Sequence, residues 1–254
     1  MNEQNKPIQA VLSVSTLAIR FKLLNGMWLK NKVKQTKRLL KAGGPCFVAK
    51  LLVQKLLAPV VRFGSVIFFA GGIAYEPQQT STGKTSAGVN ILYASREDYP
   101  ALIRGRTPAI SYEKYTRRLD SGDRCVIAVT PLGEIVHSRW ITTNPRHIPE
   151  IGMALVPGPK DLYFYDGYTW PDYRGRDIDG EVRSFIFQQL RERGLDRAVS
   201  YVAGNNLVGL KAARRKQKCI GRLVYFCFGN MKPVVIWKSN LDGVRLVEAA
   251  GNDE

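Results

Sequence analysis

The segment "DLYFYDGYTWPDYRGRDIDGEVRSFIFQQLRERG", residues 161–194, predicts a strand, a tight turn and a helix in succession. Its first part is a short run of apolar and aromatic residues, which is typical of a buried strand. The helix after the turn is amphipathic, with Val182, Ile186 and Leu190 on one face, and Gly194 follows its end. A turn that enters a helix presents free backbone N–H groups and the positive end of the helix dipole, so this turn is a candidate anion site.

Further strands and helices are predicted on both sides of this segment. Apolar runs predict strands at residues 65–73, 89–94 and 197–204, and hairpins at 124–143 and 221–237. Helical spacing predicts helices at 96–104, 111–122 and 205–218. The order of these elements predicts an α/β fold in which helices cover both faces of a mixed central sheet.

The chain of 254 residues is strongly basic, with a formal net charge of +17. Residues 1–75 hold twelve Lys and Arg residues against a single acid, Glu3. An excess of this size favours an anionic partner, such as a phosphorylated cofactor, nucleic acid or an acidic membrane. Simple solubility is the alternative explanation.

Composition divides the chain into four parts. Residues 1–75 are predicted to form a basic helical leader that ends in a strand, its two helices separated at Ala42–Pro45 and the second running from Phe47 to Arg62. Residues 76–88 are polar and turn-rich and are interpreted as a linker, 89–240 as the main domain and 241–254 as a tail. The leader either contacts anionic lipid or nucleic acid, or packs its apolar faces on the sheet.

Metal binding and membrane insertion are not indicated by the sequence. The four cysteines form no C-x-x-C pair, and His137 and His147 are the only histidines, so a zinc site is not expected. Scattered cysteines fit a reducing compartment. We find neither a signal peptide nor an apolar run of the length that a membrane span needs, and we therefore expect a cytoplasmic protein.

The turn and the strand that follows its helix resemble a known family. "PDYRGRDI" (171–178), a helix and then "GLDRAVSYVAGNN" (194–206) are similar to the GNAT superfamily of acyl-CoA-dependent N-acyltransferases. The hairpin "CVIAVTPLGEIVHSRW" (125–140) resembles the second and third strands of that family. The similarity covers residues 89–237, and residues 36–62 resemble the basic helical leader of some bacterial members.

This resemblance implies acetyl-CoA or another acyl-CoA as co-substrate, direct acyl transfer to an amine, no metal, and a sheet whose strands separate after the family's fourth strand. The strands near Leu162–Thr169 and Arg197–Val202 would then be parallel neighbours that diverge at their C-terminal ends. The backbone of Tyr168, Thr169 and Trp170 would line the pantetheine arm. Asn206 would face the thioester end. The turn itself would hold the pyrophosphate through Arg174, Gly175, Arg176, Asp177, Ile178, Asp179 and Gly180.

Several residues depart from the family pattern. Asp177 and Asp179 replace glycines, Ala213 replaces a tyrosine that protonates the leaving thiolate in many members, and Gln217-Lys218 replaces a glycine-phenylalanine pair. Carboxylates at glycine positions would crowd and repel a phosphate. Alternatively, one of the two aspartates caps the helix by accepting a hydrogen bond from a first-turn N–H.

Acyl transfer to an amine requires a neutral amine, correct placement and a donor for the oxyanion. A backbone N–H near Tyr168–Thr169 is the predicted oxyanion donor. Asp161 is the predicted base, with Tyr165 on the same strand face as a second catalytic candidate; both also fit purely structural roles. Asp166 would face the other side unless Gly167 marks a bulge, and His137 is a further candidate base.

Two functions follow from these observations. The first is an N-acyltransferase that acts on an amine the sequence does not identify, with an amino sugar or another cell-envelope precursor as an example. The second is a non-catalytic GNAT-fold protein that binds a ligand or associates peripherally with the inner face of a membrane. Nucleic-acid binding ranks third, because no recognition motif accompanies the charge.

Overall fold

The computed structural model describes residues 44–46, 49, 52–53, 60–72, 88–104, 109–229 and 231–249. Contacts divide the chain into two compact units, Met1–Pro59 and Val60–Glu254. The described residues of the first unit are helical. The remainder of the predicted leader helices, and the linker up to residue 87, lie outside the described residues.

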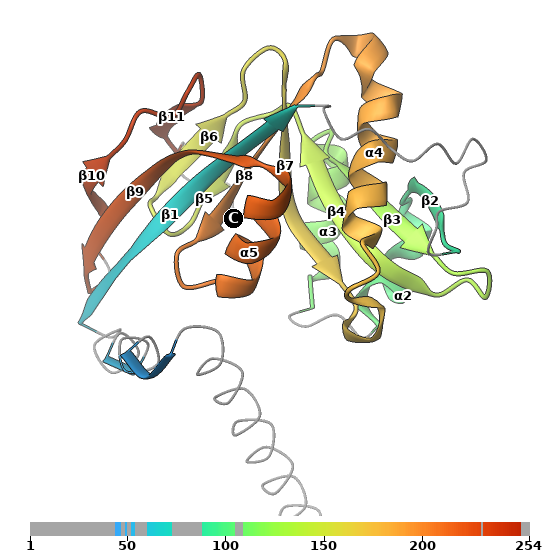
Figure 1. Cartoon of the computed structure of the whole chain (residues 1–254), viewed down its shortest axis with the longest axis horizontal. Helices are drawn as coiled ribbons and strands as arrows, with labels where there is room; N and C mark the ends of the chain where they lie inside the picture. Colours follow the sequence, from blue (N-terminus) through green and yellow to red (C-terminus); the bar gives the residue numbers. More distant parts are fainter. Residues whose placement is uncertain are drawn as a thin grey trace, which may run out of the picture. The chain divides into compact units, whose positions relative to one another are not determined.

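An eight-stranded sheet forms the second unit, in the order β10–β9–β1–β8–β7–β4–β3–β2 (Figure 1). A smaller sheet of three strands has the order β11–β6–β5, which the sequence did not predict. The strands are β1 (Val61–Gly72), β2 (Asn90–Tyr93), β3 (Arg124–Val129), β4 (Ile135–Thr142), β5 (Arg146–Ile148), β6 (Met153–Val156), β7 (Asp161–Thr169), β8 (Arg197–Ala203), β9 (Lys218–Phe228), β10 (Val234–Lys238) and β11 (Arg245–Glu248).

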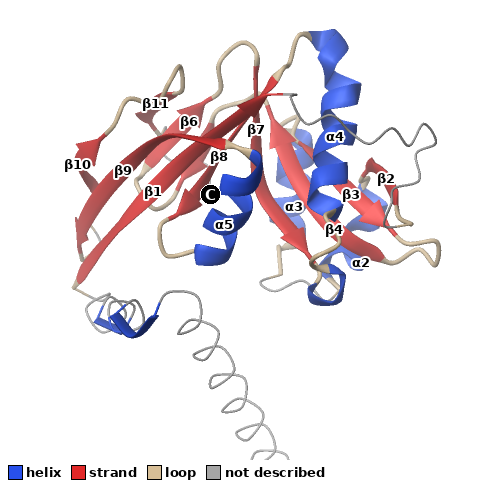
Figure 2. Ribbon diagram, viewed as in Figure 1, coloured by secondary structure: helices blue, strands red, loops and turns tan. Residues whose placement is uncertain are grey.

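Helices cover both faces of the large sheet (Figure 2). Helices α4 (Ile178–Leu190) and α5 (Leu207–Lys216) pack on one face, and α2 (Tyr99–Ile103) and α3 (Tyr112–Asp120) on the other. Short 3-10 turns η1 (Arg96–Asp98), η2 (Pro171–Tyr173) and η3 (Arg191–Arg193) flank α2 and α4. The predicted mixed α/β fold class is confirmed.

The strand pair β7–β8 is parallel, whereas the other described neighbours in the large sheet are antiparallel. Register pairs join only three positions, from Asp161↔Arg197 to Tyr163↔Val199. Beyond them β7 and β8 no longer pair with each other, and we call the residues that follow Tyr163 and Val199 the β7–β8 divergence. The predicted parallel pair that separates toward its C-terminal ends is confirmed.

Strand β1 lies in the interior of the sheet, between β8 and β9. Its residues Val66, Phe68 and Phe69 are completely buried, because this part of the strand has neighbours on both edges and packed side chains on both faces. Arg62 belongs to β1 and not to the predicted leader helix, and β11 lies within the predicted tail. The domain boundaries at 75, 88 and 240 stay predictions.

Two truncations test the contribution of β1. A chain that begins at Glu76 lacks β1, so β8 and β9 lose their shared neighbour, and we expect insoluble protein. A chain that begins at Val60 keeps β1 and should stay soluble and unfold cooperatively. Urea denaturation followed by circular dichroism distinguishes the two. A chain starting at Glu76 that unfolds at the same urea concentration as the longer one would contradict the central place of β1.

Candidate functional site

The turn between β7 and α4 keeps the backbone of a glycine-containing turn although an aspartate occupies it. Gly175 has a φ of 86° and Asp177 a φ of 53°, both left-handed. Aspartate tolerates this region better than most residues do. The turn therefore has the local conformation that a glycine at position 177 would favour, and α4 begins directly after it at Ile178.

Asp177 occupies the N-cap position, but its side chain makes no capping hydrogen bond. Its carboxylate instead accepts a bond from Lys216 Nζ at 2.6 Å, while its backbone oxygen accepts the N–H of Gly180 at 2.8 Å. The capping role considered for Asp177 is therefore wrong. Lys216 ends α5, so this contact ties the end of one helix to the start of the other.

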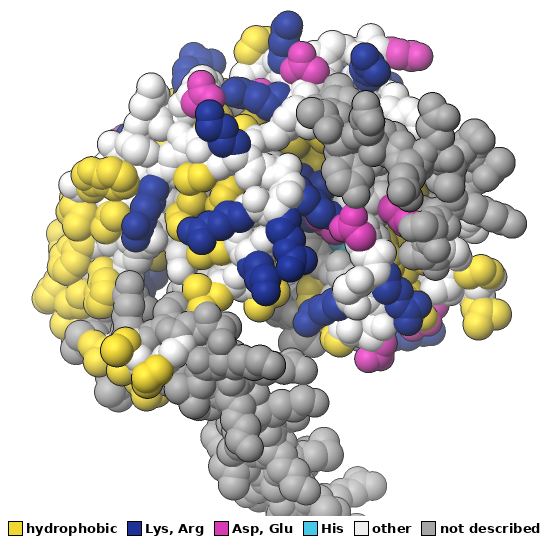
Figure 3. Space-filling model, viewed as in Figure 1, with side chains coloured by type: hydrophobic (Ala, Val, Ile, Leu, Met, Phe, Trp, Pro, Cys, Tyr) yellow, Lys and Arg dark blue, Asp and Glu magenta, His cyan; other side chains and the backbone are white. Residues whose placement is uncertain are grey.

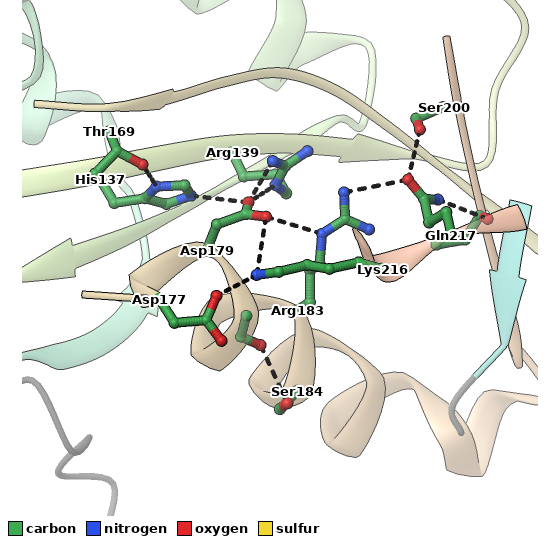
Figure 4. A network of polar contacts seen from close by, with 12 residues as sticks. His137, Arg139, Thr169, Asp177, Asp179, Arg183, Ser184, Ser200, Lys216 and Gln217 are labelled. Carbon is green, nitrogen blue, oxygen red and sulfur yellow. Dashed lines mark hydrogen bonds and ion pairs between the residues drawn. The ribbon is translucent and has the colours of Figure 1, made fainter. Parts of the chain in front are cut away.

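Asp179 lies at the centre of a cationic cluster (Figure 4). Its carboxylate accepts bonds from Arg139 Nε of β4 at 2.9 Å and Arg183 Nε of α4 at 3.1 Å, and Lys216 Nζ lies 3.5 Å away. Burial alone would raise the pKa of Asp179, but Arg139, Arg183 and the other neighbours hold it well below its usual range. Asp179 is therefore ionised at neutral pH.

His137 of β4 borders the same cluster. It is almost fully buried, its Nδ1 lies 2.8 Å from Thr169 Oγ1, and its Nε2 lies 3.7 Å from the nearer Asp179 oxygen without a hydrogen bond. Burial lowers the pKa of His137 to about 3, more than the Asp179 carboxylate raises it. The imidazole is therefore neutral at physiological pH.

The cluster contains three cations, Arg139, Arg183 and Lys216, and two carboxylates, Asp177 and Asp179. The carboxylates do not stand as bare negative charges in the turn, as the sequence led us to expect. They are neutralised from three different elements, so their repulsion of a phosphate is reduced. Sequence spacing offers a signal only for the Asp179–Arg183 pair, which is an i,i+4 contact on one helix.

A small cavity of about 20 Å³ adjoins the cluster, enough room for a water molecule. A Cβ added at Gly180 would lie 2.5 Å from an Asp177 carboxylate oxygen and 2.8 Å from Lys216 Nζ, so a larger residue there would displace this ion pair. The cavity is lined by Gly71, Gly72, Gly180, Arg183, Phe187, Lys216 and Gln217.

Arg174 and Arg176 stay near the turn. Arg174 Nε donates to the carbonyl of Thr169 at 3.0 Å, and the Arg176 guanidinium lies 5.0 Å from the ring centre of Tyr173. Both are exposed. They are placed to add charge to an anion bound at the start of α4.

A bulge interrupts β7 at Asp166 and Gly167, the position where the sequence left open whether a bulge would turn Asp166 to the other face. Ser138 pairs with Tyr168 and Trp140 with Tyr165, so β7 holds one residue more than β4 between these pairs. Asp166 has a φ of 46°, and its carboxylate accepts a bond from Arg118 of α3 at 2.8 Å. The bulge therefore turns Asp166 toward the α3 face of the sheet.

That face carries an aromatic and acidic group of side chains. Tyr163 stacks on both Tyr165 and Tyr201, and the Tyr201 hydroxyl donates to Glu150 at 3.2 Å. The Tyr165 hydroxyl donates to buried Asp123. Burial raises the pKa of Tyr165 far above its ordinary value, so it keeps its proton.

Asp161 and Asn206 lie at opposite ends of the β7–β8 pair. Asp161 is buried at the paired end, where Arg197 binds both its oxygens at 2.6 and 2.8 Å, and these contacts favour a structural role. Asn206 follows β8 at the divergent end and caps α5 by accepting the N–H of Gly209 at 2.9 Å. The structure thus brings Asn206, Thr169 and the turn to the same end of the strands, and leaves Asp161 at the other.

Trp170 and Ala213 are the two remaining positions that the family resemblance singled out, and both are buried. Trp170 is buried, and its Nε1 donates to the carbonyl of Arg104 at 2.6 Å. Its ring packs edge-on against Tyr168. Ala213 is buried against β1.

Comparison with known proteins gives similarity only at the level of structure: no family model and no curated protein matches the chain. A protein of unknown function from Staphylococcus epidermidis is similar over 71% of this chain and 68% of its own, with 11% identity and a TM-score of 0.47. A GNAT-family acetyltransferase from Colwellia psychrerythraea is similar over 70% of this chain and 62% of its own, with 16% identity and a TM-score of 0.45. An aminoglycoside 6'-N-acetyltransferase from Acinetobacter baumannii is similar over 60% of this chain and 99% of its own, with 14% identity and a TM-score of 0.41. This chain therefore spans less than two thirds of the Colwellia enzyme.

Within the described residues, no helix is long and apolar enough to cross a membrane. The same residues contain no group of three His, Cys, Asp or Glu side chains arranged to hold a metal ion.

The buried neutral His137 should make the protein sensitive to acid. Its folded pKa of about 3 lies below the ordinary 6.5, so between these values the unfolded chain binds a proton that the folded chain does not. The free energy of unfolding should therefore fall as the pH drops below 6.5, by up to about 1.4 kcal/mol per pH unit. His137→Gln should remove this part of the slope in urea titrations at several pH values. An unchanged slope, or an equal change in the matched variant His147→Gln, would contradict the assignment.

Proposed function

We propose that the chain is an acyl-CoA-dependent N-acyltransferase of the GNAT type. The observation that carries the proposal is the β7–β8 divergence, which opens beside the turn that starts α4. A strand edge without a partner offers hydrogen bonds to the amides of a pantetheine arm, and a helix start attracts a pyrophosphate. The resemblance of residues 171–178 to the GNAT turn favours a ligand that has both parts.

The backbone of Thr169 supports this placement of the pantetheine. The N–H of Trp170 donates to the carbonyl of Val136, so Trp170 and Val136 form a hydrogen-bonded pair. Hydrogen-bonded and non-hydrogen-bonded pairs alternate along an antiparallel ladder. The Thr169 N–H therefore points away from β4 toward the side of β8, where it can bind the pantetheine or a developing oxyanion.

Charge at the turn supports the pyrophosphate. The cluster around Asp179 has one cation more than it has carboxylates, and Arg174 and Arg176 add two exposed guanidinium groups. The N-terminal dipole of α4 has the same sign. Acetyl-CoA or a longer acyl-CoA is the donor we propose for this turn.

The amine acceptor belongs on the α3 face. Burial raises the pKa of the Tyr201 hydroxyl, and the negative charges of Glu150 and Asp166 raise it further. Two carboxylates therefore lie near this hydroxyl, beside the divergence. Carboxylates attract an ammonium group, and the tyrosine rings suit a sugar ring. Glu150 is the base we propose, because Asp166 is paired with Arg118. An amino sugar or another cell-envelope precursor is the acceptor class.

A second candidate is a non-catalytic protein of the same fold. The contacts of Lys216 with Asp177 and Asp179 favour it, since they join α5 to α4 across the divergence without any ligand. A donor would have to enter beside this link. Binding of acyl-CoA separates the two candidates.

Calorimetric titration with acetyl-CoA should detect binding, and Asp177→Asn should tighten it. Asparagine tolerates the left-handed backbone, removes a negative charge from the turn and releases Lys216 toward the phosphates. A gain of about 1 kcal/mol corresponds to roughly a fivefold lower Kd. Glu192→Gln is the matched control, because it removes the same charge from an exposed position beyond the other end of α4. If neither the wild type nor Asp177→Asn binds acetyl-CoA at millimolar concentration, the non-catalytic candidate stands.

Glu150→Gln should lower kcat by about a hundredfold or more, because loss of a general base typically costs 10²–10⁴ in rate. The Kd for acetyl-CoA should not change, since Glu150 lies on the acceptor face. The assay follows CoA release from acetyl-CoA with glucosamine as acceptor, and exposed Glu248→Gln serves as control. Equal loss of donor binding, or unchanged kcat, would remove Glu150 from the proposed role.

A further inference from the structure

Beyond the proposed activity, the second unit carries an apolar face at one end of its large sheet that no described helix covers. Phe63 pairs with Phe226 and Val61 with Phe228 across β1 and β9, and Val234 pairs with Phe226 across β10. Cross-strand partners point to the same side of a sheet. The resulting apolar face consists of Val61, Phe63, Val224, Phe226, Phe228, Val234 and Trp237.

This apolar face is exposed to a degree unusual for its composition. Phe228 is 53%, Val234 57% and Trp237 51% exposed. Helix α5 covers Ile67 and Phe69, further along the same face of β1, and leaves the first half of the strand open. Ile236 and Met231, at the edge and the turn beside it, are also largely exposed. A contiguous apolar surface of this kind marks an interaction site.

The segment that contains α5, β9 and β10 is basic. Residues 197–241 contain nine Lys and Arg residues and no Asp or Glu. Arg222 pairs with Ile67 and shares the apolar face's side of the sheet, on which α5 presents exposed Lys211, Arg214 and Arg215. Figure 3 shows Lys and Arg side chains next to an apolar patch at the β9–β10 end of the second unit.

We propose that this apolar face and its basic surroundings bind the surface of an anionic lipid bilayer. Aliphatic and aromatic side chains enter the headgroup region while Lys and Arg contact the anionic lipids, and tryptophan favours that interface. A second copy of the chain would bring two basic surfaces together, which disfavours self-association. Nucleic acid would use the aromatic rings but gains nothing from the valines, which offer no ring to stack on.

Vesicle sedimentation of the full chain tests the proposal. The protein should bind vesicles of mixed phosphatidylglycerol and phosphatidylcholine and not pure phosphatidylcholine. Phe228→Ser with Trp237→Ser should weaken binding about tenfold or more, because two apolar anchors are lost. Leu132→Ser is the matched control, since Leu132 is 96% exposed on the β3–β4 turn and lies outside the face. Thermal melting checks that the variants fold.

Quenching by brominated lipid adds a readout that is specific to the face. Trp140 and Trp170 are buried, so in a Trp28→Phe variant quenching of tryptophan fluorescence reports mainly on Trp237. We expect quenching by anionic brominated vesicles. Unchanged vesicle binding of the double variant would overturn the proposal in favour of the leader alone. If the wild type forms a dimer and the double variant does not, the face binds a second copy of the chain and the proposal is overturned. If single-stranded RNA displaces the vesicles and the double variant no longer binds RNA, the face binds nucleic acid and the proposal is overturned.

Discussion

The ion pair between Asp161 and Arg197 fixes the strand contact on which the site depends. It joins the first register pair of β7 and β8, which are the only parallel neighbours among the described strands of the large sheet, and both Asp161 oxygens are bound. Removing one partner of such a largely buried pair costs on the order of 3 kcal/mol. With the pair fixed at one end, β7 and β8 separate after Tyr163 and expose backbone at the other. The carboxylate at the start of β7 thus anchors the paired end of the two strands.

The same divergence decides how the turn at α4 is used. Because β7 and β8 separate, α4 and α5 lie on either side of the divergence, and Lys216 spans it to reach Asp177 and Asp179. This link offsets the carboxylates and holds the helix start in place. The proposed acyl-CoA donor would compete with this internal contact, so its affinity would depend on how readily Lys216 leaves its carboxylates. Donor binding and helix–helix contact would then be coupled at one side chain.

The two faces of the sheet suit different tasks. The α4–α5 face carries the cationic cluster and the helix start, which attract an anion, whereas the α3 face carries the carboxylate of Glu150, which attracts a cation. Opposite charges on the two sides of one divergence would orient an anionic donor and an ammonium acceptor toward each other. The apolar face at β9 and β10 lies outside both and adds a separate surface.

The sequence alone determined the local elements, because short-range patterns encode them. The apolar run of β7, the amphipathic face of α4 and the turn at Gly175 were each predicted, and so was the parallel pair with β8. Only the tertiary structure decided contacts between distant segments. It placed β1 between β8 and β9, and it brought Arg139 and Lys216, 77 residues apart, onto one carboxylate. Such pairings depend on which surfaces meet when the sheet assembles, and no periodicity in a single sequence records that choice.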